Sequence, residues 1–148
     1  MKLAYRAAAL VLAGLALTAS PAAAKEHQVK MLNKGAQGLM VFEPAFIKIA
    51  PGDTVKFLAT NKGHNAESVA GMAPAGGTTF KGKINEEIVV RFNKQGLYGY
   101  KCLPHVGMGM VGLVQVGGAG NKSQAAAAAQ SLPGIGKKRM NALLTKAR

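Results

Sequence analysis

The sequence is poor in acidic residues and in cysteine. Its 148 residues include six Asp and Glu, one Cys and no Trp. A single cysteine cannot form an intramolecular disulfide, although the 49% of hydrophobic residues suffice for a core. Among so few carboxylates no paired-carboxylate or Ser-His-Asp arrangement stands out, which argues against an enzyme.

Long apolar runs are also absent after the N-terminus. Residues 1–24 contain Lys2 and Arg6, then an apolar stretch, then an Ala-rich end at 22–24. This pattern is typical of a secretory signal peptide cleaved before Lys25. An uncleaved membrane anchor is the alternative, but the apolar stretch is shorter than the ~20 residues that a membrane span needs. We therefore expect an exported, soluble protein, located in the periplasm.

The net charge is strongly positive, at +13. Loss of residues 1–24 would remove two of the 19 Lys and Arg residues and no acidic residue, which leaves +11. Such a charge concerns partners and encounter rates. Because export separates the protein from nucleic acid, we expect an acidic protein partner.

Between residues 25 and 120 the sequence favours short strands. Apolar and polar residues alternate, or β-branched residues cluster, between turns rich in Gly, Pro and Asn. The expected strands cover residues 28–34, 39–42, 46–49, 54–59, 87–92, 97–102 and 111–116. Residues 72–77 have the composition of a loop. An all-β sandwich or barrel domain is predicted.

Residues 121–148 have a different character and predict two helices. The Ala-rich segment 123–131 is expected to be helical, with Asn121 or Ser123 as its N-cap, and 137–147 forms the second helix. We expect this pair to pack on the sandwich. The segment Leu132–Lys138 resembles a helix-hairpin-helix motif that binds DNA phosphates. A Pro-Gly break is the alternative, and it fits an exported protein better.

One loop collects metal-ligating side chains. Cys102 is followed by His105 three residues later and by Met110 after five more. A thiolate, two imidazoles and a weak axial thioether form the blue-copper site, so a second histidine is required. A bound metal would also protect a lone thiol in an oxidising compartment. Met108 could serve as the axial ligand, but Met110 adjoins the strand 111–116 and is preferred.

The second histidine is predicted to be His64. It lies in the loop Asn61–Asn65 at the end of the strand 54–59, where a loop residue can meet another loop of the sandwich. An ordinary loop histidine is the alternative reading, which the Cys loop makes less attractive. His27, near the predicted mature N-terminus, is expected to be a solvated surface residue.

Several short segments of the sequence resemble those of the cupredoxins. Asn61–Asn65 together with Cys102–Met110 carries the general resemblance, and Met31–Gly35, Met40–Pro44 and Pro51–Val55 are similar to pseudoazurins. The similarity covers residues 28–117 and extends to the two-helix tail. It implies a Greek-key sandwich of about eight strands. It also implies one type 1 copper ion, bound by His64, Cys102, His105 and Met110, that carries single electrons as Cu(II)/Cu(I).

The resemblance further implies how the site is supported and used. Asn65 would tie the two ligand loops, with its backbone amide near the Cys102 sulfur, and Pro104 would stiffen the loop. His105 would lie in an apolar patch formed by Pro104, Val106, Gly107, Met108, Met40 and Pro44. A ring of lysines would steer an acidic partner: Lys34, Lys62, Lys81 and Lys101.

The implied electron acceptors are nitrite reductases or other denitrification enzymes, and the implied donors are c-type cytochromes. The carrier itself is expected to be a monomer. Three alternatives stay open. The lysines could serve solubility alone. Met72, Met108 and Met110 could belong to a copper-storage or delivery protein, although two histidines favour a redox couple. The same ligands could hold structural zinc, which the axial Met disfavours.

Overall fold

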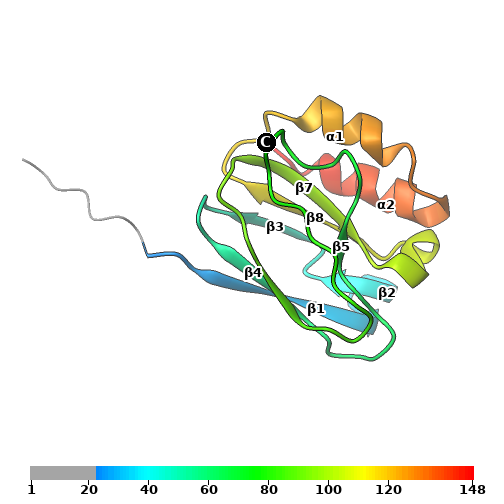
Figure 1. Ribbon diagram of the computed structural model, residues 1–148. Coiled ribbons are helices and arrows are strands. Elements are labelled where there is room, and N and C mark those ends of the chain that lie inside the picture. Colours follow the sequence, from blue (N-terminus) through cyan, green and yellow to red (C-terminus); the bar gives the residue numbers. More distant parts are fainter. Residues whose placement is uncertain (1–22) are drawn as a thin grey trace, which may run out of the picture.

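The computed structural model describes residues 23–148, and the predicted signal peptide falls almost entirely outside them. Two four-stranded sheets face each other (Figure 1). The first has the order β2-β1-β4-β6 and contains β1 (Glu26–Gly35), β2 (Gly38–Glu43), β4 (Thr54–Leu58) and β6 (Ile88–Arg91). The second has the order β3-β8-β7-β5 and contains β3 (Phe46–Ile49), β5 (Glu67–Ser68), β7 (Gly96–Lys101) and β8 (Val111–Val116). The predicted eight-stranded sandwich is confirmed.

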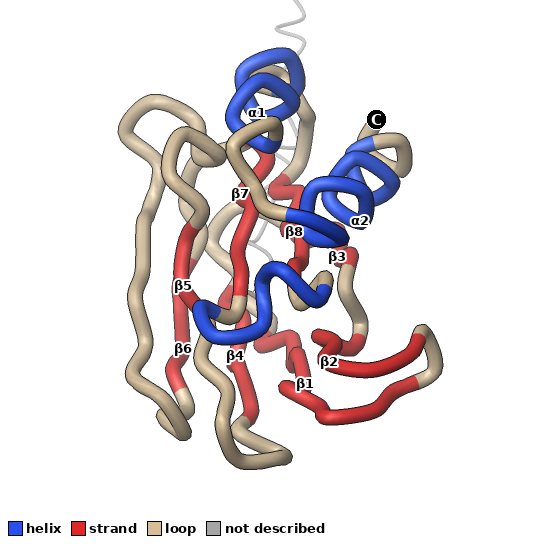
Figure 2. Tube along the Cα trace, turned by 90° about the vertical axis from the view of Figure 1, so that its right-hand side faces the viewer, coloured by secondary structure: helices blue, strands red, loops and turns tan. Residues whose placement is uncertain are grey.

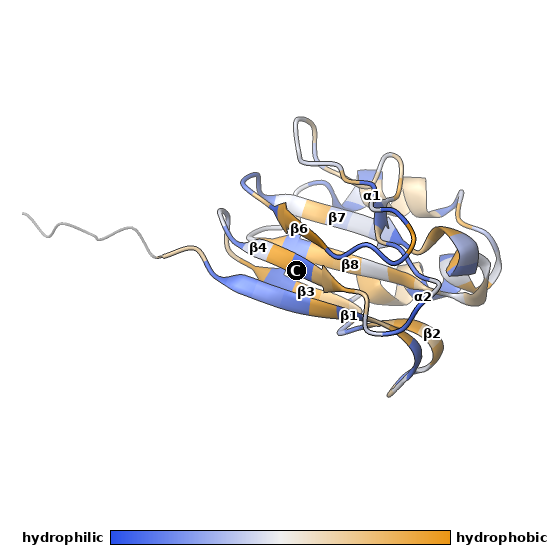
Figure 3. Cartoon of the chain, turned by 60° about the horizontal axis from the view of Figure 1, so that its bottom comes forward, coloured by the Kyte–Doolittle hydropathy of each residue, from blue (hydrophilic) through white to orange (hydrophobic). Residues whose placement is uncertain are grey.

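Strand alternation builds the core between the sheets. β1 buries Val29 and Met31 while the residues between and beside them face outward, as a period of two requires. The rings of Phe42 and Phe57 contact Tyr100 edge-on, with centroids 4.8 and 5.0 Å apart. Figure 3 shows hydrophilic and hydrophobic segments along β1 and hydrophobic segments along β8. Each large side chain buried here contributes about 1.5–3 kcal/mol.

The strand register brings two loops together at one end of the sandwich. β5 pairs antiparallel with β7, so that Glu67 lies opposite Lys101. The residues just before β5 therefore lie beside the residues just after β7. β7 continues into the 3₁₀ helix η1 (Leu103–Met108) and returns as β8, with Lys101 opposite Val111. The sequence pattern did not predict β5 or η1.

The two tail helices cover the outer face of the second sheet. Helices α1 (Lys122–Ala129) and α2 (Gly134–Leu144) lie side by side above β7 and β8 (Figures 1 and 2). A second apolar cluster joins them to the sheet: Val69, Met72, Leu97, Val111, Leu113, Ala125, Ala129, Leu132, Met140, Leu143, Leu144 and Ala147. β8 is consequently buried along its whole length. The predicted packing of the tail on the sandwich is confirmed.

Two details of the tail differ from expectation. α2 begins at Gly134, three residues earlier than predicted. Asn121 occupies the N-cap position of α1 without capping it. Its Oδ1 instead accepts the backbone N–H of Leu97 (2.7 Å) and its Nδ2 donates to the Leu97 carbonyl (3.0 Å), which ties the tail to β7.

The division of the chain after residues 24 and 120 stays a prediction. Within residues 23–148, no helix combines the length and apolarity that a membrane span requires.

Candidate metal centre

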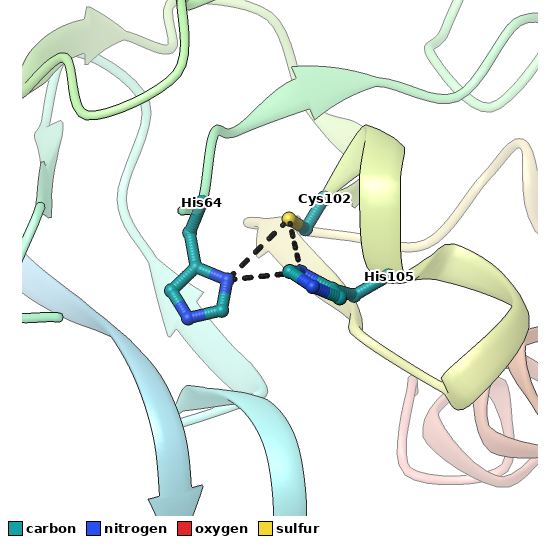
Figure 4. A group of neighbouring side chains, drawn as sticks. All are labelled: His64, Cys102 and His105. Atoms are coloured by element: carbon teal, nitrogen blue, oxygen red, sulfur yellow. Dashed lines mark hydrogen bonds between the residues drawn. The ribbon is translucent and has the colours of Figure 1, made fainter. Parts of the chain in front are cut away.

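Three of the four predicted ligands meet at one point. Figure 4 shows His64, Cys102 and His105 pointing toward one another. His64 Nδ1 and His105 Nδ1 are 3.1 Å apart, and the Cys102 sulfur lies 3.7 and 3.5 Å from these two nitrogens. Donors bound at ~2.0–2.3 Å to one ion, roughly 100–120° apart, would lie about 3–4 Å from one another. The spacing therefore fits a single metal ion.

The strand pairing explains how distant residues converge here. Cys102 directly follows β7, and His64 lies just before β5, its hydrogen-bonded neighbour. Pro104 stands at the start of η1, where its missing N–H costs nothing. Gly109 ends η1 with φ +97°, a conformation that favours glycine. The Cys102 N–H then donates to the Met110 carbonyl (3.0 Å) and closes the loop.

The two candidate methionines have opposite environments. Met110 is fully buried in the core between the sheets, next to the first residue of β8. Met108 is 46% exposed on η1. A buried thioether beside a strand is held in place by packing, whereas an exposed one is free to move. The burial therefore supports the choice of Met110 over Met108.

His64 is prepared for metal binding by a residue of β1. Its ring is fully buried, and its Nε2 donates to Oδ1 of Asn33 (2.7 Å). This bond leaves the Nδ1 lone pair directed at Cys102 and His105. Burial lowers the pKa of His64, and the nearby His105 lowers it further. Both effects favour the neutral imidazole, which is the form that ligates metals. Sequence reasoning missed Asn33, although it lies in the string Met31–Gly35 that carried the family resemblance.

The Cys102 thiol is buried, which disfavours its ionised form. Burial raises its pKa, and the charge of Glu67 adds to the rise. Backbone N–H groups of Asn65 and His105 donate toward the sulfur and oppose this rise. A metal ion bound to the Cys102 sulfur would displace the thiol proton.

The predicted tie between the two ligand loops is confirmed at Asn65. Its side chain is buried, and its Oδ1 accepts the backbone N–H of Leu103 (2.7 Å). Its Nδ2 donates to Oε2 of Glu67 (3.0 Å) and to the Gly82 carbonyl (3.1 Å). One side chain therefore fixes the His64 loop, the start of η1 and the loop that carries Gly82.

His27 lies apart from this cluster. Its Nε2 is 2.9 Å from Oδ2 of Asp53, and it is partly buried, not freely solvated as expected. Asp53 also accepts the backbone N–H groups of Lys25 (2.9 Å) and Ala50 (3.1 Å). The Lys25 bond, followed by the His27 bond, lowers the pKa of Asp53 to about 2.

The surface around His105 is apolar. His105 and Val106 are partly exposed, and Pro104, Gly107 and Met108 are exposed. Met40, from β2, is partly buried. Three further large apolar side chains are exposed, one on η1 itself and two on elements that contact it: Leu103 (51%), Leu39 (57%) in β2 and Ile135 (51%) in α2. Pro44 lines a hollow with Ala36, Glu43 and Lys146, and no residue of η1 lines that hollow.

The four predicted lysines are not equivalent. Lys34, Lys62 and Lys81 are exposed. Lys101 is three-quarters buried, and its Nζ lies 3.7 Å from Oε1 of Glu67. Because that charge is already paired, Lys101 contributes less to an outward electric field than the other three.

Comparisons with known proteins agree with this site. Residues 29–117 match the plastocyanin/azurin family of copper-binding proteins. The chain is 46% identical over 142 residues to a pseudoazurin of Paracoccus pantotrophus, covering 96% of this chain and 97% of the relative. It is 51% identical over 123 residues to a pseudoazurin of Methylorubrum extorquens, covering 83% of each. A solved pseudoazurin from Hyphomicrobium denitrificans superposes with a TM-score of 0.76 at 46% identity, covering 83% of this chain and 98% of that structure. The chain therefore belongs to the pseudoazurins, electron-transfer proteins of the plastocyanin/azurin family whose cofactor is one type 1 copper ion.

Proposed function

We propose that His64, Cys102, His105 and Met110 bind the copper ion, with Met110 as the axial ligand. The observation that carries this assignment is the cluster of three donor atoms, all within 4.8 Å of one another. A bound copper ion supplies reversible one-electron chemistry between Cu(II) and Cu(I). The residues around the site then hold one geometry for both oxidation states.

Rigidity of the ligand set supports a carrier. The donors of His64 and Cys102 are buried, and Asn33 and Asn65 fix the loops that bear them. Ligands held in this way reorganise little when an electron arrives or leaves, which favours fast transfer. Three buried ligands also leave little access for a substrate to the metal, so the arrangement supports electron transfer over catalysis.

Electrons would enter and leave through His105. His64 and Cys102 are fully buried, whereas the His105 ring is partly exposed within the apolar patch of η1. A partner that docks on Pro104, Gly107 and Met108 would therefore come close to a copper ligand. Such an interface is small, which suits a carrier that must dissociate after each transfer.

The net positive charge supports an acidic redox partner. Lys34, Lys62 and Lys81 are exposed and would accelerate encounter with an acidic surface. We propose a periplasmic nitrite reductase or another denitrification enzyme as acceptor, c-type cytochromes as donors, and a monomeric carrier. A charge reversal tests the steering: Lys81→Glu should lower the rate of electron transfer to a copper nitrite reductase at low salt about tenfold. Lys94→Glu is the control, because Lys94 is exposed just before the start of β7, at the end of that strand away from Cys102, and it should have a smaller effect.

The visible spectrum of the purified protein tests the metal site. Cu(II) added to the mature protein should give an intense thiolate-to-copper band that bleaches with reductant and returns on oxidation. The band should be absent from Cys102→Ser. A colourless protein that binds only Cu(I) would indicate storage or delivery, and a preference for Zn²⁺ would indicate a structural metal. Either result would overturn the proposal.

A further inference from the structure

The segment Leu132–Lys138, which resembles a DNA-binding hairpin in the sequence, lies against the ligand loop. It contains the end of the link between α1 and α2 and the first turn of α2. That turn packs on η1, which Figure 2 draws as the blue segment beneath α2. The tail therefore touches the loop that bears His105 and ends at Met110, far from its own position in the sequence.

Two glycines permit this contact. A Cβ added at Gly136 would clash with the Val106 carbonyl oxygen, and one at Gly134 would lie 2.9 Å from the Gly107 carbonyl oxygen. Such distances to backbone atoms are below van der Waals contact, so any larger residue would have to push helix and loop apart. Gly134 also has φ +50°. The start of α2 consequently rests directly on the backbone of η1.

Arg139 makes the second contact, one turn further along α2. Its Nη1 donates to the Gly109 carbonyl (3.1 Å) and lies 3.5 Å from the carbonyls of Leu39 and Met40 in β2. A Cβ at Gly109 would lie 2.7 Å from Cδ of Arg139. Met40 has the unusual φ of +48°. One guanidinium thus joins the tail, the residue before Met110, and β2 at a residue with a strained backbone.

We propose that α2 positions the copper loop, with Gly134, Gly136 and Arg139 as the positioning residues. This inference rests on the proposed ligand set, since His105 and Met110 are the ligands that flank the contacted segment. η1 buries no residue of its own, so the loop cannot be fixed by its own packing. The glycines of the hairpin-like motif serve this contact inside the protein.

The test compares variants at the contact with matched controls elsewhere. Gly136→Ala adds the methyl group that meets Val106, and Arg139→Met keeps the long side chain but removes the donor. Gly120→Ala adds a methyl group where nothing lies within 4 Å. Leu144→Ala weakens the apolar cluster near the other end of α2. Each variant is measured by amide hydrogen exchange without metal, by its Cu(II) absorption bands, and by Cu(II) affinity.

Gly136→Ala and Arg139→Met should accelerate amide hydrogen exchange in residues 105–110 and shift the relative intensities of the Cu(II) absorption bands. Both should also weaken Cu(II) binding about tenfold, as expected for residues that support ligands. Gly120→Ala should match the wild type. Leu144→Ala should lower stability but leave the bands in place. Unchanged bands and exchange in Arg139→Met, or equal changes in Leu144→Ala, would overturn the proposal. Because exchange is measured without metal, a wild type that fails to bind copper would refute the ligand set separately.

Discussion

Replacement of Asn65 by alanine should destabilise the protein and disturb the copper site together. The side chain is 3% exposed and makes three hydrogen bonds, to the Leu103 N–H, the Gly82 carbonyl and the Glu67 carboxylate. Alanine removes all three and leaves their partners unpaired in a buried place. The backbone amide of residue 65 also loses the anchor that keeps it near the Cys102 sulfur.

The magnitude follows from the kinds of bond that are lost. A neutral hydrogen bond contributes about 1 kcal/mol net, and a bond to a charged group contributes about 1.5–3 kcal/mol. Two neutral bonds and one bond to a carboxylate give about 4 kcal/mol. Water that enters the site and satisfies some of the freed groups will reduce this value, so we expect a loss of about 3 kcal/mol.

Asn121→Ala is the matched control. Asn121 makes two bonds to the backbone of Leu97, at the joint between β7 and the tail, and none to the metal site. It should cost about 1–2 kcal/mol. Urea unfolding of both metal-free variants measures the free energies, and the Cu(II) spectrum reports the site. A loss below about 1 kcal/mol in Asn65→Ala, or an unchanged spectrum, would refute the role that we assign to this side chain.

Three further changes test separate parts of the structure. Asn33→Ala removes the hydrogen bond that orients His64 (2.7 Å) and should weaken metal affinity about 10–100-fold in a competition titration. Asp53, with its pKa lowered to about 2, stabilises the fold above about pH 4, and this contribution disappears as the pH falls from about 4 to 2. The stability gap between wild type and Asp53→Asn in urea unfolding should therefore narrow over that range; a constant gap would contradict it. The Tyr100 hydroxyl is buried without a hydrogen-bond partner among residues 23–148, so Tyr100→Phe should leave the unfolding free energy unchanged or raise it by up to about 1 kcal/mol.

The strands that the sequence predicts well are those whose burial is visible in the local pattern. The strand expected at 111–116 has the bounds of β8, and that expected at 54–59 exceeds β4 by one residue. β5 contains two residues, too few for any period to appear, and it exists because it pairs with β7 across more than 30 residues of sequence. Long-range pairing of this kind leaves no local signal.

The ligands and their supports differ in the same way. Cys102, His105 and Met110 could be proposed as ligands from the sequence because their chemistry is rare and they are close in sequence. Asn33 and Arg139 are ordinary polar residues about 30 positions from the groups that they contact, His64 and Gly109. Nothing in their own neighbourhood marks them as supports, so only the folded chain assigns their roles.

An exposed ligand loop poses a physical problem for an electron carrier, and the tail offers a solution. His105 must be reachable by a partner, which keeps η1 at the surface and denies it a core of its own. Exposed loops of this kind are usually mobile, yet low reorganisation requires fixed ligands. A helix that packs behind the loop, through glycines on one side and Arg139 on the other, restrains the backbone and leaves the outer face free. In the proposed arrangement the tail acts on the rate of electron transfer through the metal geometry, while the partner meets only the exposed face.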